Sequence, residues 1–438
     1  MGYPRLLLVS SSLFNPFSGG GITLTNLFKG WPENRIAAVH TETYPLDTTI
    51  CSHNYALVAK ELGWFWPLNH ILSARKLGRE NSNNAEITAN NIQNTIAHVS
   101  VYRRIFRFVN RLIANEGFQD YVTVTAPLKR WVTDFQPDII YTLLGSLGYM
   151  RLVRELVNLT GAKLVIHMMD DWPSVRYRQG VLSGIFRRQM EIELNQIIKN
   201  TTLCMGISPA MCKAYQQRYG REFFSYSNAL DMAVWMRFAK QDWQRNDPVE
   251  IMYSGAILNE AQLSSLLDIC RAVEALNQQG LDVVFSIHTP QPFRDVHQTD
   301  FDDFSHTSLN VPLNNDDVAG AMSAADILAL PVNFDRHTRR YVRYSNPTKI
   351  PAYMISGTPI LAYGPLGVDQ IDRAERDGWG YVVSDQGVEN VVSAIRELVQ
   401  SPALREKIGR EAQHVAQRDH DIITVSRSFQ EKLKRAAI

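Results

Sequence analysis

Short apolar segments alternate along this chain with segments in which apolar residues recur at helical spacing, and this alternation constrains the fold most. In the first half, the strand-like segments are Arg5–Ser10, Arg35–His40, Asp138–Thr142, Lys163–Met168 and Leu203–Ile207. Strands that alternate with helices form a parallel sheet, because each helix returns the chain to the same end of the sheet. The first half therefore predicts a doubly wound α/β domain.

The second half repeats the pattern, and its strand-like segments are Glu250–Ser254, Asp282–Ile287, Ser308–Val311, Asp326–Leu330, Pro359–Ala362 and Tyr381–Val383. A chain of 438 residues is too long for one ordinary core, so we expect two domains with a cleft between them. The predicted parts are an N-terminal domain at 1–235, a linker at 236–248, a C-terminal domain at 249–420 and a helix at 421–438. That last helix is expected to pack back across the junction. The pattern is lost at about 50–120, which predicts a helical insertion.

Composition excludes several other classes of protein. The apolar fraction of 45% and the charged fraction of 20% are typical of globular proteins, and no apolar run approaches the ~20 residues that span a bilayer. A net charge of +1 argues against a nucleic-acid partner. The apolar run at the start is too short for a secretory signal, so cytoplasmic residence is the default. The four cysteines lack metal-ligand spacing, so no metal is expected.

The segment from Tyr344 to Pro365 combines a helix start with a buried strand. Ser345 and Asn346 are good N-cap residues, Pro347 suits the first helical turn, and Gly357 ends the helix. Backbone N–H groups at such a helix start bind anions, so Ser345, Asn346 and Thr348 are candidate ligand contacts.

Basic residues are concentrated beside this helix start, at Arg336, Arg339, Arg340, Arg343 and Lys349. Together they favour the binding of an anion such as a diphosphate. The alternative for any one of them is a solvated basic loop, because charge runs usually lie on the surface.

A triple glycine, Gly19–Gly20–Gly21, follows the first predicted strand and opens a helix. Without side chains, the backbone there could approach a phosphate or a sugar closely. The alternative is a plain flexible turn. We predict that this turn closes over the phosphates of a ligand.

The strand Lys163–Met168 is followed by Asp170 and Asp171, at the edge where open α/β sheets bind their ligands. A carboxylate is natural in a cleft and costly in a core, so Asp170 is the first catalytic candidate, with Asp171 beside it. His167 is a third candidate if it reaches the cleft, but a hydrogen-bonded core histidine is the more common fate of such a residue.

The segment 101–113 carries apolar residues at helical spacing and four arginines. Such a helix could lie on an anionic membrane, which would make peripheral membrane contact possible and point to a lipid-linked acceptor. The alternative, which we favour, is a helix that packs on its own domain.

Several motifs occur in one order along the chain: Ser18–Gly21, Gln136–Ile140, Ile207–Met211, Asn228–Asp231, Tyr253–Gly255 and Ser345–Pro359. In this order they resemble the GT-B glycosyltransferases, specifically glycosyltransferase family four. The resemblance implies two facing Rossmann-like domains, with the donor nucleotide on the C-terminal one and the acceptor on the N-terminal one. It also implies contact of Gly255 with the donor, metal independence, no cofactor besides the sugar nucleotide, and retention of anomeric configuration.

The chain departs from the family pattern at several positions. Family members usually carry two glutamates eight positions apart, and Tyr344 and Ala352 occupy the matching positions. The histidine that many relatives have beside the catalytic acid aligns with Met169. These departures leave open a different donor, a relocated contact or a weakened enzyme.

The leading hypothesis is a glycosyltransferase that moves a sugar from a nucleotide diphosphate to a glycan or lipid-linked acceptor in surface polysaccharide or glycoconjugate synthesis. The alternative is a catalytically silent GT-B protein that binds a sugar nucleotide or a glycan as a partner in a biosynthetic complex. A third, weaker alternative is a sugar-nucleotide isomerase with the same pair of domains.

Overall fold

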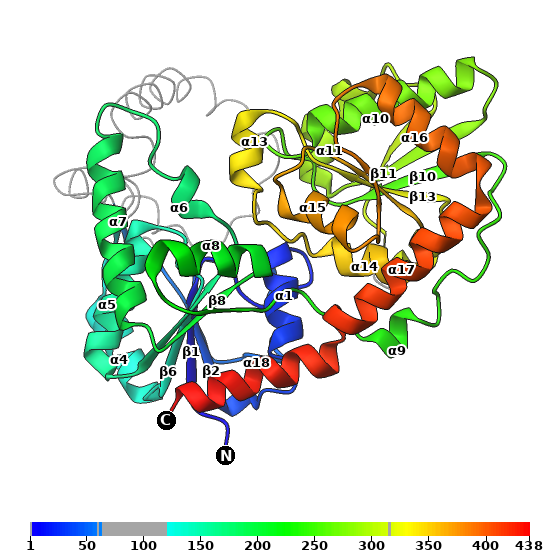
Figure 1. Ribbon diagram of the computed structural model, residues 1–438. Helices are drawn as coiled ribbons and strands as arrows, with labels where there is room; N and C mark the ends of the chain where they lie inside the picture. The colour runs from blue at the N-terminus through cyan, green and yellow to red at the C-terminus, as the bar shows by residue number, and fades with distance from the viewer. Residues whose placement is uncertain (1, 59–60, 64–120, 314–316) are drawn as a thin grey trace, which may run out of the picture.

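The computed structural model describes residues 2–58, 61–63, 121–313 and 317–438. In these ranges the chain forms two α/β domains that lie side by side (Figure 1). The fold class predicted from the alternation of strands and helices is confirmed. Residues 64–120, which include the predicted helix at 101–113 and most of the insertion, lie outside the described residues.

The N-terminal domain contains a parallel sheet of seven strands in the order β3-β2-β1-β6-β7-β8-β9. The five strands predicted above are β1 (Leu6–Ser10), β2 (Ile36–His40), β6 (Ile139–Thr142), β7 (Lys163–Met168) and β8 (Leu203–Gly206). Two short strands were not predicted, β3 (Asn54–Ala56) and β9 (Phe223–Ser225). They form the two edges of the sheet.

Side chains of β1 alternate between two apolar layers, as the pleat of a strand requires. Leu7 and Val9 pack with α4 (Ala126–Phe135), α5 (Leu147–Thr160) and α7 (Ser183–Asn200). Leu6 and Leu8 pack on the other face with α1 (Gly19–Leu27) and α18 (Ile422–Ala436). Because helices cover both faces, every residue of β1 is buried.

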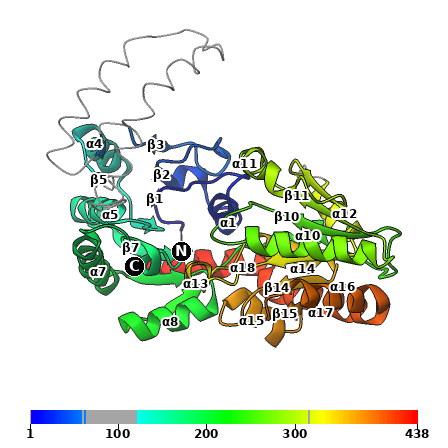
Figure 2. The same ribbon diagram turned by 90° about the horizontal axis from the view of Figure 1, so that it is seen from above.

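The C-terminal domain contains a parallel sheet of six strands in the order β12-β11-β10-β13-β14-β15. Its strands are β10 (Val249–Ser254), β11 (Val283–His288), β12 (Thr307–Asn310), β13 (Ile327–Pro331), β14 (Ile360–Tyr363) and β15 (Tyr381–Val383). One face packs on α10 (Leu263–Gln278) and α16 (Val388–Gln400), and the other on α14 (Lys349–Ser356) and α17 (Pro402–His420). Figure 2 shows the two sheets and their helices from above.

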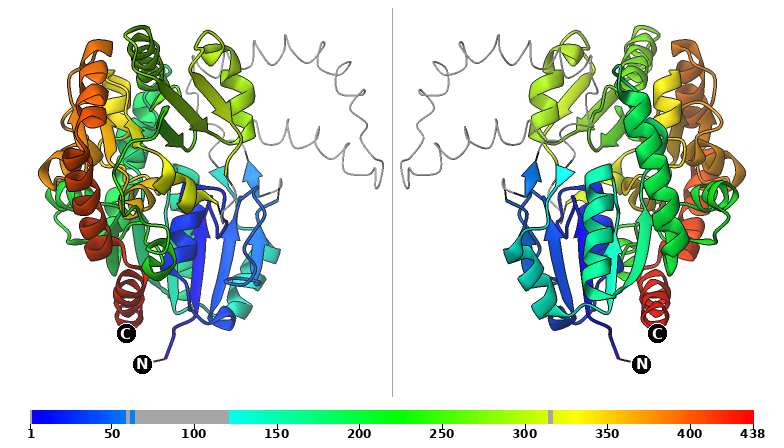
Figure 3. Two further views of the ribbon diagram at one scale, coloured as in Figure 1. Left: turned by 90° about the vertical axis from the view of Figure 1, so that its right-hand side faces the viewer. Right: turned by 90° about the vertical axis from the view of Figure 1, so that its left-hand side faces the viewer.

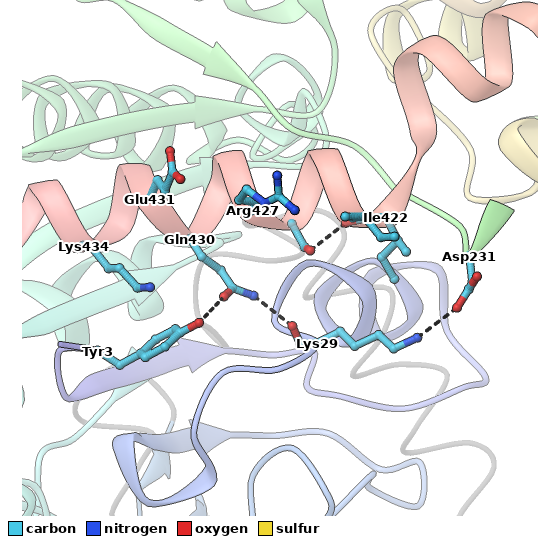
Figure 4. A pocket seen from close by; sticks show the side chains of 10 residues that line it. Tyr3, Lys29, Asp231, Ile422, Arg427, Gln430, Glu431 and Lys434 are labelled. Carbon is cyan, nitrogen blue, oxygen red and sulfur yellow. Dashed lines mark hydrogen bonds and ion pairs between the residues drawn. The ribbon is translucent and has the colours of Figure 1, made fainter. Parts of the chain in front are cut away.

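Helix α18 leaves the C-terminal domain and packs on α1 of the N-terminal domain (Figure 1). Both chain termini consequently lie at the same end of that domain (Figure 3). Phe429 of α18 is fully buried in its core. The Gln430 amide accepts a hydrogen bond from the Tyr3 hydroxyl at 3.1 Å and donates one to the carbonyl of Lys29 at 3.0 Å (Figure 4). The hollow in Figure 4 lies on the outside of the junction, where α18 is anchored.

The segment predicted as a linker, 236–248, is fastened to the C-terminal domain. The Trp243 indole donates a hydrogen bond to the carbonyl of Gly357 at 2.8 Å. The buried Arg405 guanidinium donates to the carbonyls of Trp243 and Val399, at 3.0 and 2.8 Å. The chain therefore crosses between the domains before this segment, at 226–231, and crosses back after the C-terminal domain, at 420–422.

Candidate functional site

Helix α1 begins with the three glycines of the predicted turn. They form its first turn rather than a loop before it, and the Ser18 hydroxyl caps the helix by accepting from Gly21 N–H at 3.1 Å. A side chain at Gly21 would overlap that of Asn15, and one at Gly19 would lie 3.5 Å from the Thr348 side chain. The absence of side chains therefore allows close packing, and at Gly19 it brings α1 against the C-terminal domain.

Helix α14 begins two residues later than predicted. Its first residue is Lys349 and its N-cap is Thr348, whereas Ser345, Asn346 and Pro347 lie in the preceding loop. The expectation that Ser345 or Asn346 caps this helix is wrong. Two hydrogen bonds from the N-terminal domain hold the loop: the Ser208 hydroxyl donates to Tyr344 O at 3.1 Å, and the Asn228 amide donates to Thr348 O at 3.0 Å.

Lys349, the first residue of α14, is a cation whose surroundings strongly change its pKa. Burial lowers the pKa of its ammonium group to about 7. Its Nζ lies 3.8 Å from the centre of the Tyr253 ring and 5.9 Å from that of Tyr353. Within the described residues, no carboxylate forms an ion pair with it. A cation held by aromatic rings, with no carboxylate partner, is a suitable group for an anionic ligand.

Gly255 lies directly beside Lys349. A side chain at Gly255 would lie 3.1 Å from Lys349 Nζ, and the φ of +146° of this residue favours glycine. The Tyr353 hydroxyl donates to Ser254 O at 3.3 Å and accepts from Ser254 N–H at 2.8 Å, which joins α14 to the end of β10. Neither tyrosine is among the site residues predicted from the sequence. Their signal was the Tyr253–Gly255 motif at a strand end.

The predicted arginines lie further out. Arg339 and Arg343 are exposed. The Arg339 guanidinium donates to Leu366 O at 3.2 Å, and that of Arg343 lies 5.2 Å from the centre of the Tyr344 ring. The structure therefore brings Gly19, Thr348, Gly255 and Lys349 together in one place and leaves these two arginines around it.

Asp170 follows β7 and faces the C-terminal domain. Asp170 as a whole is exposed to solvent. The protein around its carboxyl group nevertheless raises the pKa of that group, first through desolvation and then through the charge of Asp171. The Ser345 hydroxyl bonds to this carboxyl and acts in the opposite direction. The predicted catalytic acid and a predicted donor-binding residue thus meet across the domain contact.

Asp171 and His167 have structural surroundings. Asp171 is 3% exposed, accepts a hydrogen bond from the Tyr215 hydroxyl at 2.7 Å and lies 3.7 Å from Arg218 Nη1. His167 is fully buried between the Tyr141 hydroxyl, 2.6 Å from Nδ1, and the carbonyl of Tyr226, 3.0 Å from Nε2.

These contacts assign the protons of His167. A carbonyl can only accept, so Nε2 carries the proton and Nδ1 accepts from Tyr141. Burial lowers the pKa of His167 to about 4, which keeps the ring neutral. The structure places this histidine in the core of the N-terminal domain, as the alternative for it stated, and away from the domain contact.

No group of three or more His, Cys, Asp or Glu side chains with the geometry of a metal site occurs among the described residues. Likewise, none of the described helices is long and apolar enough to cross a membrane.

Comparison with known proteins gives one family match over part of the chain and several matches of fold. Residues 268–431 match the family model described as glycosyl transferase-like. No protein with a curated description matches the sequence. Solved structures match over nearly the whole chain. HepE from Anabaena, in complex with UDP-glucose, is 13% identical, with coverage of 98% of this chain and 99% of HepE and a TM-score of 0.60.

Two further structures agree. Sucrose-phosphate synthase from Thermosynechococcus elongatus is 13% identical, with 98% of both chains covered and a TM-score of 0.62. WaaG, a glycosyltransferase involved in lipopolysaccharide biosynthesis, is 11% identical, with 97% of this chain and 98% of WaaG covered and a TM-score of 0.56. The chain has the fold of the GT-B glycosyltransferases. With the family match over 268–431, this confirms the predicted resemblance to the GT-B glycosyltransferases.

Two of the departures from the family pattern, Ala352 and Tyr344, lie in α14 and in the loop before it. Ala352 is 7% exposed and packs in the apolar layer between the sheet and α17. Tyr344 is half-buried beside Ser208. Neither position offers a carboxylate.

Proposed function

We propose that this protein transfers a sugar from a nucleotide-diphosphate sugar to a glycan or lipid-linked acceptor, with retention of anomeric configuration. The observation that carries the proposal is Lys349, a half-buried cation without a carboxylate partner, beside Gly255 and close to the contact between Thr348 and Gly19. HepE, which shares the fold, binds UDP-glucose. A uridine nucleotide is therefore the first donor to try.

In this proposal the diphosphate is the leaving group. When the bond between the sugar and the phosphate oxygen breaks, the electron pair stays on the diphosphate and its charge grows. Lys349 would neutralise that charge, with support from the N–H groups at the start of α14 and of α1, so the step needs no metal ion. Ser345, Asn346 and Thr348 would line the phosphates from the loop before α14.

Asp170 would act on the other side of the sugar. Its raised pKa suits a carboxyl group that takes a proton from the acceptor hydroxyl or holds a sugar hydroxyl. The acceptor would lie on the N-terminal domain, and synthesis of surface polysaccharide or glycoconjugate in the cytoplasm is the setting that we propose. The segment 101–113, for which membrane contact was considered, lies outside the described residues.

A second candidate function is a silent GT-B protein that binds a sugar nucleotide or a glycan. The observation that favours it is the pair Tyr344 and Ala352 in place of the two glutamates. Turnover of the donor separates the two candidates.

The test is calorimetric binding of UDP-, GDP-, dTDP- and ADP-sugars, followed by mass spectrometry of donor breakdown. We expect one donor to bind and to be consumed when acceptor is supplied. Asp170→Asn should keep the affinity for that donor and lose at least 100-fold in turnover, the contribution typical of a general base. Binding without turnover by the wild type, across acceptor extracts, would favour the silent protein.

A further inference from the structure

Asn228 lies where four segments of the two domains meet. It follows β9 in the first crossing between the domains and is 2% exposed. Its amide Nδ2 donates to Thr348 O of the C-terminal domain at 3.0 Å, and its Oδ1 accepts from Asn26 Nδ2 of α1 at 2.9 Å. One side chain therefore joins the helix that carries Gly19 to the N-cap of the helix that carries Lys349.

Both atoms of the Asn228 amide are assigned by their partners. Thr348 O can only accept, so the amide nitrogen has to face it. A reversed amide would place two oxygen atoms against each other. The hydrogen-bond pattern consequently fixes the orientation of the side chain.

The second crossing is tied to the same residue. His420 Nδ1 donates to the carbonyl of Asn228 at 2.9 Å. Leu230 N–H donates to His420 O, and Ile422 N–H donates to Leu230 O, each at 2.9 Å, which forms a short parallel bridge between the crossings. A rotation of one domain against the other would therefore have to distort or break these hydrogen bonds.

We propose that Asn228 is a positioning residue that holds the start of α1 and the start of α14 in the relative position in which both can reach one diphosphate. Its bonds join Asn26 and Thr348 directly, and the Gly19 contact with Thr348 lies on the same path. The link to a diphosphate rests on the proposed function. The link between the domains stands without it.

The test measures the distance between the domains. All four native cysteines are buried, so Glu155→Cys and Gln400→Cys, at exposed positions of α5 and α16, can carry spin labels selectively. In Asn228→Ala we expect the distance distribution to broaden and its maximum to shift, because the direct side-chain bonds to α1 and α14 are lost. Asn26→Ala, which removes one of the two bonds, should give a smaller change and covers the case that Asn228→Ala does not fold.

Asn277→Ala is the matched control. Asn277 is half-buried and makes three side-chain hydrogen bonds, to Val273 and Val283, and all of them lie within the C-terminal domain. It should lose thermal stability and keep the wild-type distance distribution. Wild-type distributions in both Asn228→Ala and Asn26→Ala, or the same change in Asn277→Ala, would overturn the proposal.

A second readout joins the inference to the donor. We expect Asn228→Ala to weaken binding of the donor nucleotide about tenfold and Asn277→Ala to leave it within twofold. The spin-label measurement needs no nucleotide, so its failure is separable from a failure of the proposed transferase function. A changed distance with unchanged nucleotide affinity would remove the diphosphate from the proposal.

Discussion

At the scale of single residues, the contacts of a side chain decide whether it is available to bind a ligand. Lys349 has aromatic rings and a glycine around it, and no ion pair with a carboxylate within the described residues. Asp171, the candidate that the sequence places beside Asp170, already has partners in Tyr215 and Arg218. Sequence spacing cannot show which of the two side chains, Lys349 or Asp171, is available to a ligand. Only their contacts in the structure show it.

The lowered pKa of Lys349 makes a testable prediction about protons. With a pKa of about 7, the free ammonium group is about half protonated at pH 7, and a bound diphosphate would raise that pKa. The complex then holds more protons than the free protein, so donor binding takes up protons and weakens as the pH rises through 7. Calorimetry in buffers of different ionisation enthalpy measures this uptake.

Lys349→Ala should lose the uptake near pH 7 and at least tenfold in affinity, because a charge-assisted contact is lost. Arg343→Ala is the useful comparison, since Arg343 is exposed and stacks on Tyr344. A binding enthalpy that does not depend on the buffer in the wild type would exclude Lys349 from the diphosphate site.

At the scale of elements, the sequence predicted which strands and helices exist better than it predicted where they begin and end. All eleven predicted strands are found, and unbroken apolar runs such as β1 and β13 are buried on both faces. The start of α14 was predicted too early, since N-cap residues at Ser345 and Asn346 satisfy the local rules. Bonds from Ser208 and Asn228, far away in the sequence, hold the loop before α14 in another conformation. Local patterns cannot reveal such tertiary contacts.

The junction of α16, α17 and the linker depends on one buried cation. Arg405 is 1% exposed. Its guanidinium donates hydrogen bonds to the carbonyls of Trp243, Leu398 and Val399. Arg405→Met would leave these acceptors without a donor in a buried place. We expect the free energy of unfolding of the C-terminal domain to fall by about 3 kcal/mol.

Urea denaturation followed by circular dichroism measures this loss. Lys407→Met, an exposed lysine on the same helix, is the matched control and should change the free energy by less than about 0.5 kcal/mol. Equal losses in the two variants would show that the carbonyls at Arg405 find other donors.

At the scale of the whole molecule, the sequence predicted two domains, a cleft and a C-terminal helix that packs back across the junction, but not which residues form the contacts. Asn26 and Asn228 are 202 residues apart, and Tyr3 and Gln430 are 427 residues apart. No periodicity or motif pairs such distant residues. Of the candidate site residues, Gly255 and Lys349 lie together, whereas His167 lies in the core.

The two buried histidines, His167 in the N-terminal core and His420 at the second crossing, predict how the stability of the molecule depends on pH. Burial lowers the pKa of each to about 4. In the unfolded chain each has an ordinary pKa of about 6.5, so the unfolded state binds protons first as the pH falls. Stability is therefore fully present above pH 6.5 and is lost between pH 6.5 and 4, by up to about 3 kcal/mol for each histidine.

The measurement is urea denaturation at a series of pH values from 7.5 to 4.5. His167→Gln keeps a donor toward Tyr226 O, and His420→Asn keeps one toward Asn228 O, while both remove the group that titrates. The double variant should be less stable than the wild type at pH 7.5 and lose less stability on acidification. His414→Gln, at an exposed position, should follow the wild-type profile. If the double variant also follows that profile, other groups govern the acid sensitivity and the two histidines charge without opening the structure.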